Sequence, residues 1–209
     1  MKILFIITRS DTIGGAQVHV RDLSKALIKD GHEVLVLVGL AGPYIDDLSL
    51  NQIPFRICPA LFRSIKPLQD LKTLELINRV VKEFQPDLIT THSSKAGILG
   101  RIIAKINHIP CIFTVHGWAF TEGVPQPKRV LYEMIERLIA PLSSRIICVS
   151  NYDRDIGIKA GIKSSRLKTI YNGMPDICPS LRAHPGNNDT VNVIMVARFD
   201  QQKDHSTLI

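Results

Sequence analysis

Residues 2–38 read KILFIITRSDTIGGAQVHVRDLSKALIKDGHEVLVLV, and this stretch decides the fold. Two runs rich in Ile, Leu and Val, Lys2–Thr8 and Glu33–Val38, flank a segment with helical character from Ala16 to Asp30. Gly31 then ends that segment, as glycine commonly does after a helix. Continuous apolar strands joined by a helix are typical of a parallel sheet with right-handed connections. The stretch therefore predicts a strand–helix–strand unit.

The same alternation continues to about residue 170. It predicts an α/β, Rossmann-like parallel sheet with helices on both faces. Pro86 ends the helix that follows Pro67, because proline cannot continue a helix. The further expected strands are Phe55–Cys58, Leu88–Thr91, Cys111–Val115, Arg145–Val149 and Lys168–Ile170. The further expected helices are residues 68–84, Ser94–Asn107, Lys128–Ile139 and Tyr152–Ala160.

The composition is that of a globular protein with 45% hydrophobic and 22% charged residues. The apolar run Met1–Ile7 resembles the start of a signal peptide, but Thr8 and Arg9 end it and no small-residue cleavage pattern follows. No run of about 18 apolar residues is present, so we expect no membrane-spanning helix. We therefore expect a cytoplasmic protein, or one peripheral on the inner face of the plasma membrane.

The formal charge of +7 favours anionic partners such as nucleotide phosphates, nucleic acid or an anionic membrane surface. The basic residues are dispersed and aromatics make up only 6% of the chain, which argues against a nucleic-acid partner. The four cysteines are widely separated and lack the close pairing of a zinc site. We expect them to be reduced, structural thiols.

The character of the sequence changes after residue 172. We expect residues 1–172 to form one Rossmann-like domain, residues 173–190 to be an interdomain linker rich in Pro, Gly and Asn, and residues 191–209 to begin a second domain. Val191–Val196 has the pattern of a buried strand, and a helix is expected to start at Ser206. One strand and one helical turn cannot complete a domain, so the second domain is expected to be truncated.

Ligands of parallel α/β sheets lie beyond the carboxyl ends of the strands. Gly14 and Gly15 follow the first strand, where glycine permits close backbone approach and the N–H groups at a helix start favour a diphosphate. A Gly-Gly pair is equally compatible with a tight entry to a helix. The dinucleotide pattern G-x-G-x-x-G and the phosphate-binding G-K-[ST] are both absent.

Two histidines also follow strands. His92 and Ser93 are candidates to hydrogen-bond an acceptor or sugar, although Ser93 or, preferably, Ser94 could instead cap the next helix. His116 passes directly from a buried strand into an irregular loop. We expect His116 to be catalytic and Trp118, in that loop, to contact an acceptor or sugar. The alternative is that each histidine is a satisfied core residue.

Arg198 and Lys203 follow the last expected strand. Two cations on one loop suit a diphosphate, although composition alone would make them surface charges.

Taken in order, these segments resemble glycosyltransferase family 4, the retaining enzymes with two Rossmann-like domains known as GT-B. Gly14-Gly15 and Asp30-Gly31-His32-Glu33-Val34 resemble the family's opening, and Phe113-Thr114-Val115-His116-Gly117 resembles its central strand. The later matches are Ile147-Cys148-Val149-Ser150, Ile170-Tyr171-Asn172-Gly173-Met174 and Val196-Ala197-Arg198-Phe199-Asp200-Gln201-Gln202-Lys203.

The resemblance implies transfer of a hexose from a UDP- or GDP-sugar to a lipid-linked or saccharide acceptor of the cell envelope, as in lipopolysaccharide synthesis. Gly15 would lie against the donor diphosphate, His116 would contact the transferred sugar, and Arg198 with Lys203 would neutralise the leaving group. No metal or other cofactor is implied, because fixed cations and N–H dipoles stabilise the leaving diphosphate.

The family's later Glu-x7-Glu motif is missing from these residues, and Ala197 stands where glycine is usual. We therefore expect the 209 residues to be inactive alone. One alternative is a non-catalytic acceptor- or membrane-binding module that needs a separately supplied donor half. Another is a nucleotide-sugar epimerase, which the absent fingerprint glycines disfavour.

Overall fold

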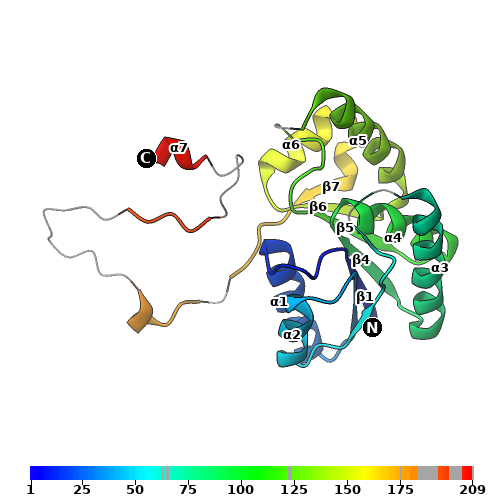
Figure 1. Cartoon of the computed structure of the whole chain (residues 1–209), viewed down its shortest axis with the longest axis horizontal. Helices are drawn as coiled ribbons and strands as arrows, with labels where there is room; N and C mark the ends of the chain where they lie inside the picture. Colours follow the sequence, from blue (N-terminus) through cyan, green and yellow to red (C-terminus); the bar gives the residue numbers. More distant parts are fainter. Residues whose placement is uncertain are drawn as a thin grey trace, which may run out of the picture. The chain divides into compact units, whose positions relative to one another are not determined.

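A computed structural model describes residues 1–62, 64, 66–121, 124–174, 176–182, 193–197 and 204–208. The chain divides into two compact units, Met1–Asn172 and Gly173–Ile209. The first unit carries nearly all of the regular structure (Figure 1).

The first unit is built on a seven-stranded, wholly parallel sheet with the strand order β3-β2-β1-β4-β5-β6-β7 (Figure 1). This arrangement confirms the predicted Rossmann-like α/β fold. Most expected strands are present with ends shifted by one residue. The strands are β1 (Lys2–Ile7), β2 (Glu33–Val38), β3 (Phe55–Ile57), β4 (Leu88–His92), β5 (Cys111–Val115), β6 (Arg145–Cys148) and β7 (Leu167–Thr169).

Helices connect successive strands. They are α1 (Gly15–Lys29), α2 (Pro43–Leu50), α3 (Pro67–Phe84), α4 (Ser94–Ile106), α5 (Gln126–Ile139) and α6 (Asn151–Lys159). Short 3-10 turns cover Ala140–Leu142 and Ser164–Arg166. The sequence patterns above did not predict α2, which buries only Tyr44 and Leu48, one helical turn apart. No described helix combines the length and the apolar character needed to cross a bilayer.

Helices pack on both faces of the sheet, as expected. In β1 the side chains alternate between the two faces: Leu4 and Ile6 join a core with α3 and α4, whereas Ile3, Phe5 and Ile7 join a core with α1 and α2. Because both faces of β1 are covered, all its residues from 3 to 7 are apolar and buried. A third core cluster lies at the other end of the sheet, around β5, β6 and β7.

The second unit has little regular structure among its described residues. A 3-10 turn covers Pro179–Leu181, and a short helix, α7, covers His205–Leu208. The prediction of a buried strand over residues 191–196 is wrong for its described part: residues 193–196 form no strand and are exposed. No described strand pairs with this segment, so its backbone groups have no ladder to join. Arg198 and Lys203 lie outside the described residues.

Candidate functional site

The sheet brings the two predicted histidines to the same edge. In the register of the parallel strands, Ile7 of β1 lies beside His92 of β4, and His92 lies beside Thr114 of β5. His116 follows β5 directly. Gly117, next in the chain, has a φ of 124°, which L-residues with side chains rarely adopt, and so allows the backbone to turn sharply after His116.

A third histidine completes a cluster with these two. His92 Nδ1 and His116 Nε2 share a hydrogen bond of 3.1 Å. His19 of α1 lies with its ring centroid 5.1 Å from that of His116 and 5.6 Å from that of His92. The sequence patterns above did not single out His19. The available signal was its position one helical turn after Gly15, because a helical side chain lies over the preceding turn.

His92 is a supporting residue of this cluster. Its side chain is fully buried, stacks on Phe5 with ring centroids 5.6 Å apart, and shares a hydrogen bond of 3.1 Å between Nε2 and Thr90 Oγ1. Its other nitrogen is engaged by His116. His92 has no exposed surface and holds His116 through this hydrogen bond. Direct contact between His92 and an acceptor or sugar stays a prediction.

Burial keeps the three imidazoles neutral. It lowers the pKa of His92 well below its usual value, and the neighbouring His116 and His19 add to the effect. Burial also lowers the pKa of His116 to about 4, again with a contribution from His19. For His19 burial lowers the pKa, while the carboxylate of Asp22 acts in the opposite direction. At neutral pH the cluster can therefore accept and donate hydrogen bonds without carrying charge.

Ser93 links two of the loops at this edge. Its Oγ lies 2.8 Å from Thr8 Oγ1 in a hydrogen bond, and its φ is 86°, an uncommon value for a residue with a side chain. The prediction that Ser94 caps the helix is wrong, because Ser94 is the first residue of α4 and Ser93 occupies the capping position without a side-chain cap. Direct contact between Ser93 and a ligand stays a prediction.

The start of α1 is open. Gly14 and Gly15 are exposed, and a Cβ added to Gly15 would meet no atom within 4 Å. Gln17 holds the loop in place: Gly14 N donates to Gln17 Oε1 at 3.1 Å, and Gln17 Nε2 donates to the carbonyl of Arg9 at 3.1 Å. Backbone N–H groups at a helix start that face open space favour an anion.

Trp118 lies away from this open surface. Its ring is buried, stacks on Phe120 with centroids 5.0 Å apart, and donates from Nε1 to the carbonyl of Asp153 at 2.7 Å. Gly157 of α6 makes room for it, because a Cβ there would come within 2.9 Å of the ring. The ring thus fastens the loop after β5 to α6, and contact between Trp118 and an acceptor or sugar stays a prediction.

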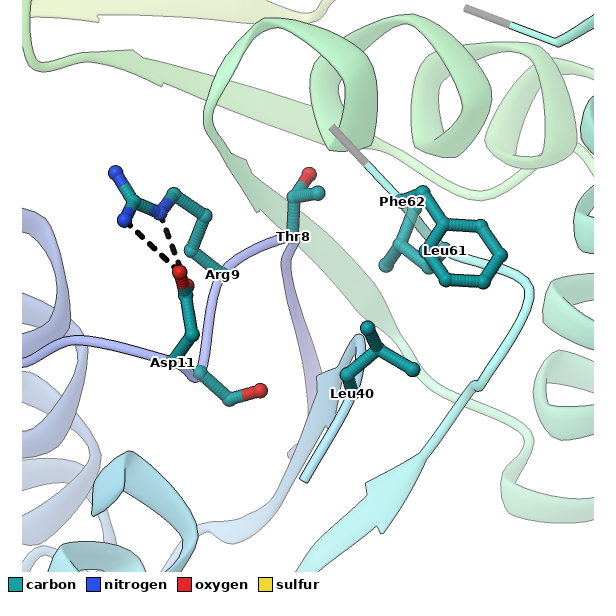
Figure 2. Close-up of a pocket in the computed structure, with 7 residues that line it drawn as sticks. Thr8, Arg9, Asp11, Leu40, Leu61 and Phe62 are labelled. Carbon is teal, nitrogen blue, oxygen red and sulfur yellow. Dashed lines mark hydrogen bonds and ion pairs between the residues drawn. The ribbon is translucent and has the colours of Figure 1, made fainter. Parts of the chain in front are cut away.

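A pocket of about 240 Å³ lies beside the site, beyond the ends of β1, β2 and β3. Figure 2 shows the ion pair on one side, where Arg9 Nε and Nη2 each donate to Asp11 at 3.0 Å, and the side chains of Leu40, Leu61 and Phe62 on the other. The remaining lining residues are Thr8 and Ser10. Sequence patterns did not find this pocket, because its walls come from three separate connections.

Comparison with known proteins identifies the family. The model of the family described as Glycosyltransferase Family 4 matches residues 13–176. This chain belongs to glycosyltransferase family 4. The matched segment includes Gly14, Gly15, all three histidines of the cluster and Trp118.

Two curated relatives come from Escherichia coli. One is the UDP-Gal:alpha-D-GlcNAc-diphosphoundecaprenol alpha-1,3-galactosyltransferase, 35% identical over 136 residues that make up 64% of this chain and 35% of the relative. Another is the O-antigen biosynthesis glycosyltransferase WbnH, 28% identical over 174 residues that make up 83% of this chain and 49% of the relative. The chain thus spans half or less of the length of these relatives.

A solved structure shares the fold. The crystal structure of Anabaena Alr3699/HepE in complex with UDP-glucose superimposes with a TM-score of 0.69 and 25% identity, over 86% of this chain and 47% of that chain.

Proposed function

We propose that this chain provides the acceptor-side half of a GT-B glycosyltransferase that transfers a hexose, with retention of configuration, from UDP- or GDP-sugar to a lipid-linked or saccharide acceptor of the cell envelope. The observation that carries the proposal is the placement of His116, held by buried His92, close to the first turns of α1. The named activities of the E. coli relatives, a lipid-diphosphate galactosyltransferase and an O-antigen transferase, support the acceptor class.

The chemistry of the site fits this reaction. When the bond between sugar and diphosphate breaks, positive charge develops on the sugar and negative charge on the leaving group. The N–H group at Gly15, which faces open space, stabilises the leaving diphosphate, whereas the N–H of Gly14 is held by Gln17. A neutral His116 accepts or donates a hydrogen bond to a sugar hydroxyl and adds no positive charge beside the reacting carbon. Arg198 and Lys203 are proposed to neutralise the diphosphate further.

We propose that the reaction needs no metal ion. The nearest nitrogens of His19, His92 and His116 all lie within 4.8 Å of one another, a spacing that an ion could also use. Two of these nitrogens are already hydrogen-bonded to each other, and the second nitrogen of His92 is bonded to Thr90. Sugar transfer that survives dialysis against EDTA is the expected result, and loss of transfer that added zinc or magnesium restores would contradict it.

The proposed setting is the cytoplasmic side of the plasma membrane, with the protein peripheral to it. The net charge of +7 supports contact with an anionic lipid surface. The second candidate is a non-catalytic module that binds an acceptor or membrane and needs a separately supplied donor half.

The test is sugar transfer from radiolabelled UDP-sugars and GDP-sugars to a synthetic GlcNAc-diphospholipid, by the protein expressed from its complete reading frame. We expect transfer with one of these donors, a product of retained configuration by NMR, and a loss of about 100-fold or more for His116→Ala, the range typical of one transition-state hydrogen bond. No transfer with any donor, but restored transfer on adding a separate donor half, would support the second candidate.

A further inference from the structure

Helix α5 exposes much of its apolar side, although Tyr132, Ile135 and Ile139 are half-buried. All of its residues are described, and the only fully buried one is a glutamate, Glu136. The neighbouring α4 is ordinary by comparison, since eight of its residues are buried. The outward apolar side chains of α5 are 49–70% exposed and comprise Val130 at 54%, Leu131 at 49%, Met134 at 55% and Leu138 at 70%.

This orientation is fixed from the inside. Glu136 Oε2 accepts from Arg101 of α4 at 2.7 Å, and both side chains are almost fully buried. Rotating α5 to bury its leucines would withdraw Glu136 and leave the Arg101 guanidinium buried without its partner, a strongly destabilising change that opposes the gain from burying those side chains. A helix whose apolar stripe faces outward needs a cover for it.

The charges beside the stripe indicate what covers it. The exposed residues of α5 include the cations Lys128 and Arg137 and no acidic residue. Arg137 also reaches the turn at Gly161, which lies between the exposed Lys159 and Lys163. An apolar stripe bordered by cations is the pattern of a helix that lies in the interface of an anionic bilayer.

We propose that α5 docks this protein on an anionic lipid surface, lying flat with Leu131, Met134 and Leu138 among the acyl chains and Lys128 at the headgroups. The inference rests on the proposed function in one respect, since a lipid-linked acceptor lies in the bilayer and docking would bring the protein to it. α5 begins ten residues after His116, so docking keeps the reaction site near the bilayer surface.

The experiment measures binding of the 209-residue chain to vesicles of phosphatidylglycerol and phosphatidylethanolamine by co-sedimentation. The variant is Leu131→Gln, Met134→Gln and Leu138→Gln combined. The matched control is Leu68→Gln with Leu71→Gln, two exposed leucines of another helix, α3. We expect the α5 variant to bind at least about tenfold more weakly and the control to bind like the wild type. Lys128→Gln should weaken binding by about fivefold, and only to anionic vesicles.

Several outcomes would overturn the proposal. Binding by the α5 variant equal to the wild type would do so, as would an equal loss in the control variant. A wild-type chain that sediments as a dimer, becomes a monomer in the α5 variant and ignores vesicles would show that a second copy covers the stripe. Circular dichroism of both variants checks that they fold, which their exposed positions favour. Because no step measures sugar transfer, a failure here is separate from a failure of the proposed enzyme.

Discussion

Two buried polar clusters in the first unit differ in how they are satisfied. Between α4 and α5, the Arg101–Glu136 ion pair brings opposite charges to 2.7 Å, with the guanidinium 4.3 Å from the ring centroid of Phe113. At the carboxyl edge of the sheet, His19, His92 and His116 gather three bases with lowered pKa values. The first cluster compensates charge, and the second avoids it.

This difference assigns a structural role to the ion pair and a functional role to the histidine cluster. A buried ion pair keeps its geometry because each charge needs the other, so it fixes how two helices pack. The three histidines, of which His92 is buried and His19 and His116 are half-buried, have no acidic partner in the hydrogen bonds described. They gain no such compensation, and a fold retains a cluster of this kind at a cost in stability. Perturbed groups of that sort gather at functional sites. The following experiments test this division, beginning with the largest effect.

Removing one charge of the ion pair should have the largest effect on stability. Glu136→Gln leaves the Arg101 guanidinium buried without its partner, so the free energy of unfolding should fall by about 3–5 kcal/mol. Urea denaturation followed by circular dichroism measures it. Glu133→Gln, on the same helix but outside the pair, should stay within about 0.5 kcal/mol of the wild type. Equal losses of unfolding free energy in Glu136→Gln and Glu133→Gln would show that the ion pair does not stabilise the packing of α4 and α5.

Acid should act on the histidine cluster. The folded pKa of His116 is about 4, below its unfolded value, so its contribution to stability is complete above the unfolded pKa of about 6.5 and is lost as the pH falls toward 4. The full loss for His116 is about 3 kcal/mol, at 1.36 kcal/mol per pKa unit.

Urea denaturation at pH 7 and at pH 4 measures this loss against His116→Gln, which has no imidazole at that position and should lose about 3 kcal/mol less on acidification. Carboxylates titrate in both proteins and therefore cancel in the comparison. A wild type and variant with the same pH dependence would show that His116 is not held neutral by the fold.

The supporting role of His92 predicts a smaller effect. Thr90→Val keeps the shape of the side chain but removes the hydroxyl that bonds to His92 Nε2, which should cost about 1–2 kcal/mol of stability. The imidazole NMR signals of His92 and His116 should shift together. Thr91→Val is the control, because the Thr91 hydroxyl bonds to the carbonyl of Ile112 instead. Unmoved signals in Thr90→Val would show that the two histidines are oriented by other contacts.

The open helix start should show the smallest effect on stability. Gly15→Ala adds a methyl group where no atom lies within 4 Å, so the free energy of unfolding should change by less than about 0.5 kcal/mol. Sugar transfer should nevertheless fall at least tenfold, because the methyl group occupies the space proposed for the diphosphate. Transfer at the wild-type rate would exclude close approach of the donor to Gly15.

Much of this fold follows from the sequence, because strands buried on both faces must be continuously apolar, as residues 3–7 are. Strand and helix ends shifted by a residue or two, since hydrophobic pattern does not fix where a ladder ends. The outward face of α5 was beyond prediction, because its orientation depends on one ion pair between residues 35 positions apart. An apolar stripe ordinarily faces the core.

The site was predictable in part for the same reason. Parallel strands end at one edge, so polar residues after β4 and β5 had to gather there. His19 was hidden within an amphipathic helix, where one polar residue has no distinguishing pattern. The sequence placed Trp118 in the loop after β5, beside His116, but only its packing under α6 shows that its ring faces inward.

Trp118 has one further consequence. It is the single tryptophan of the sequence and lies two residues after His116. Its ring is enclosed between Phe120 and the backbone of Gly157. The fluorescence of the protein thus arises mainly from one enclosed indole. Its emission therefore reports, without any added label, a change in the surroundings of the loop that follows His116.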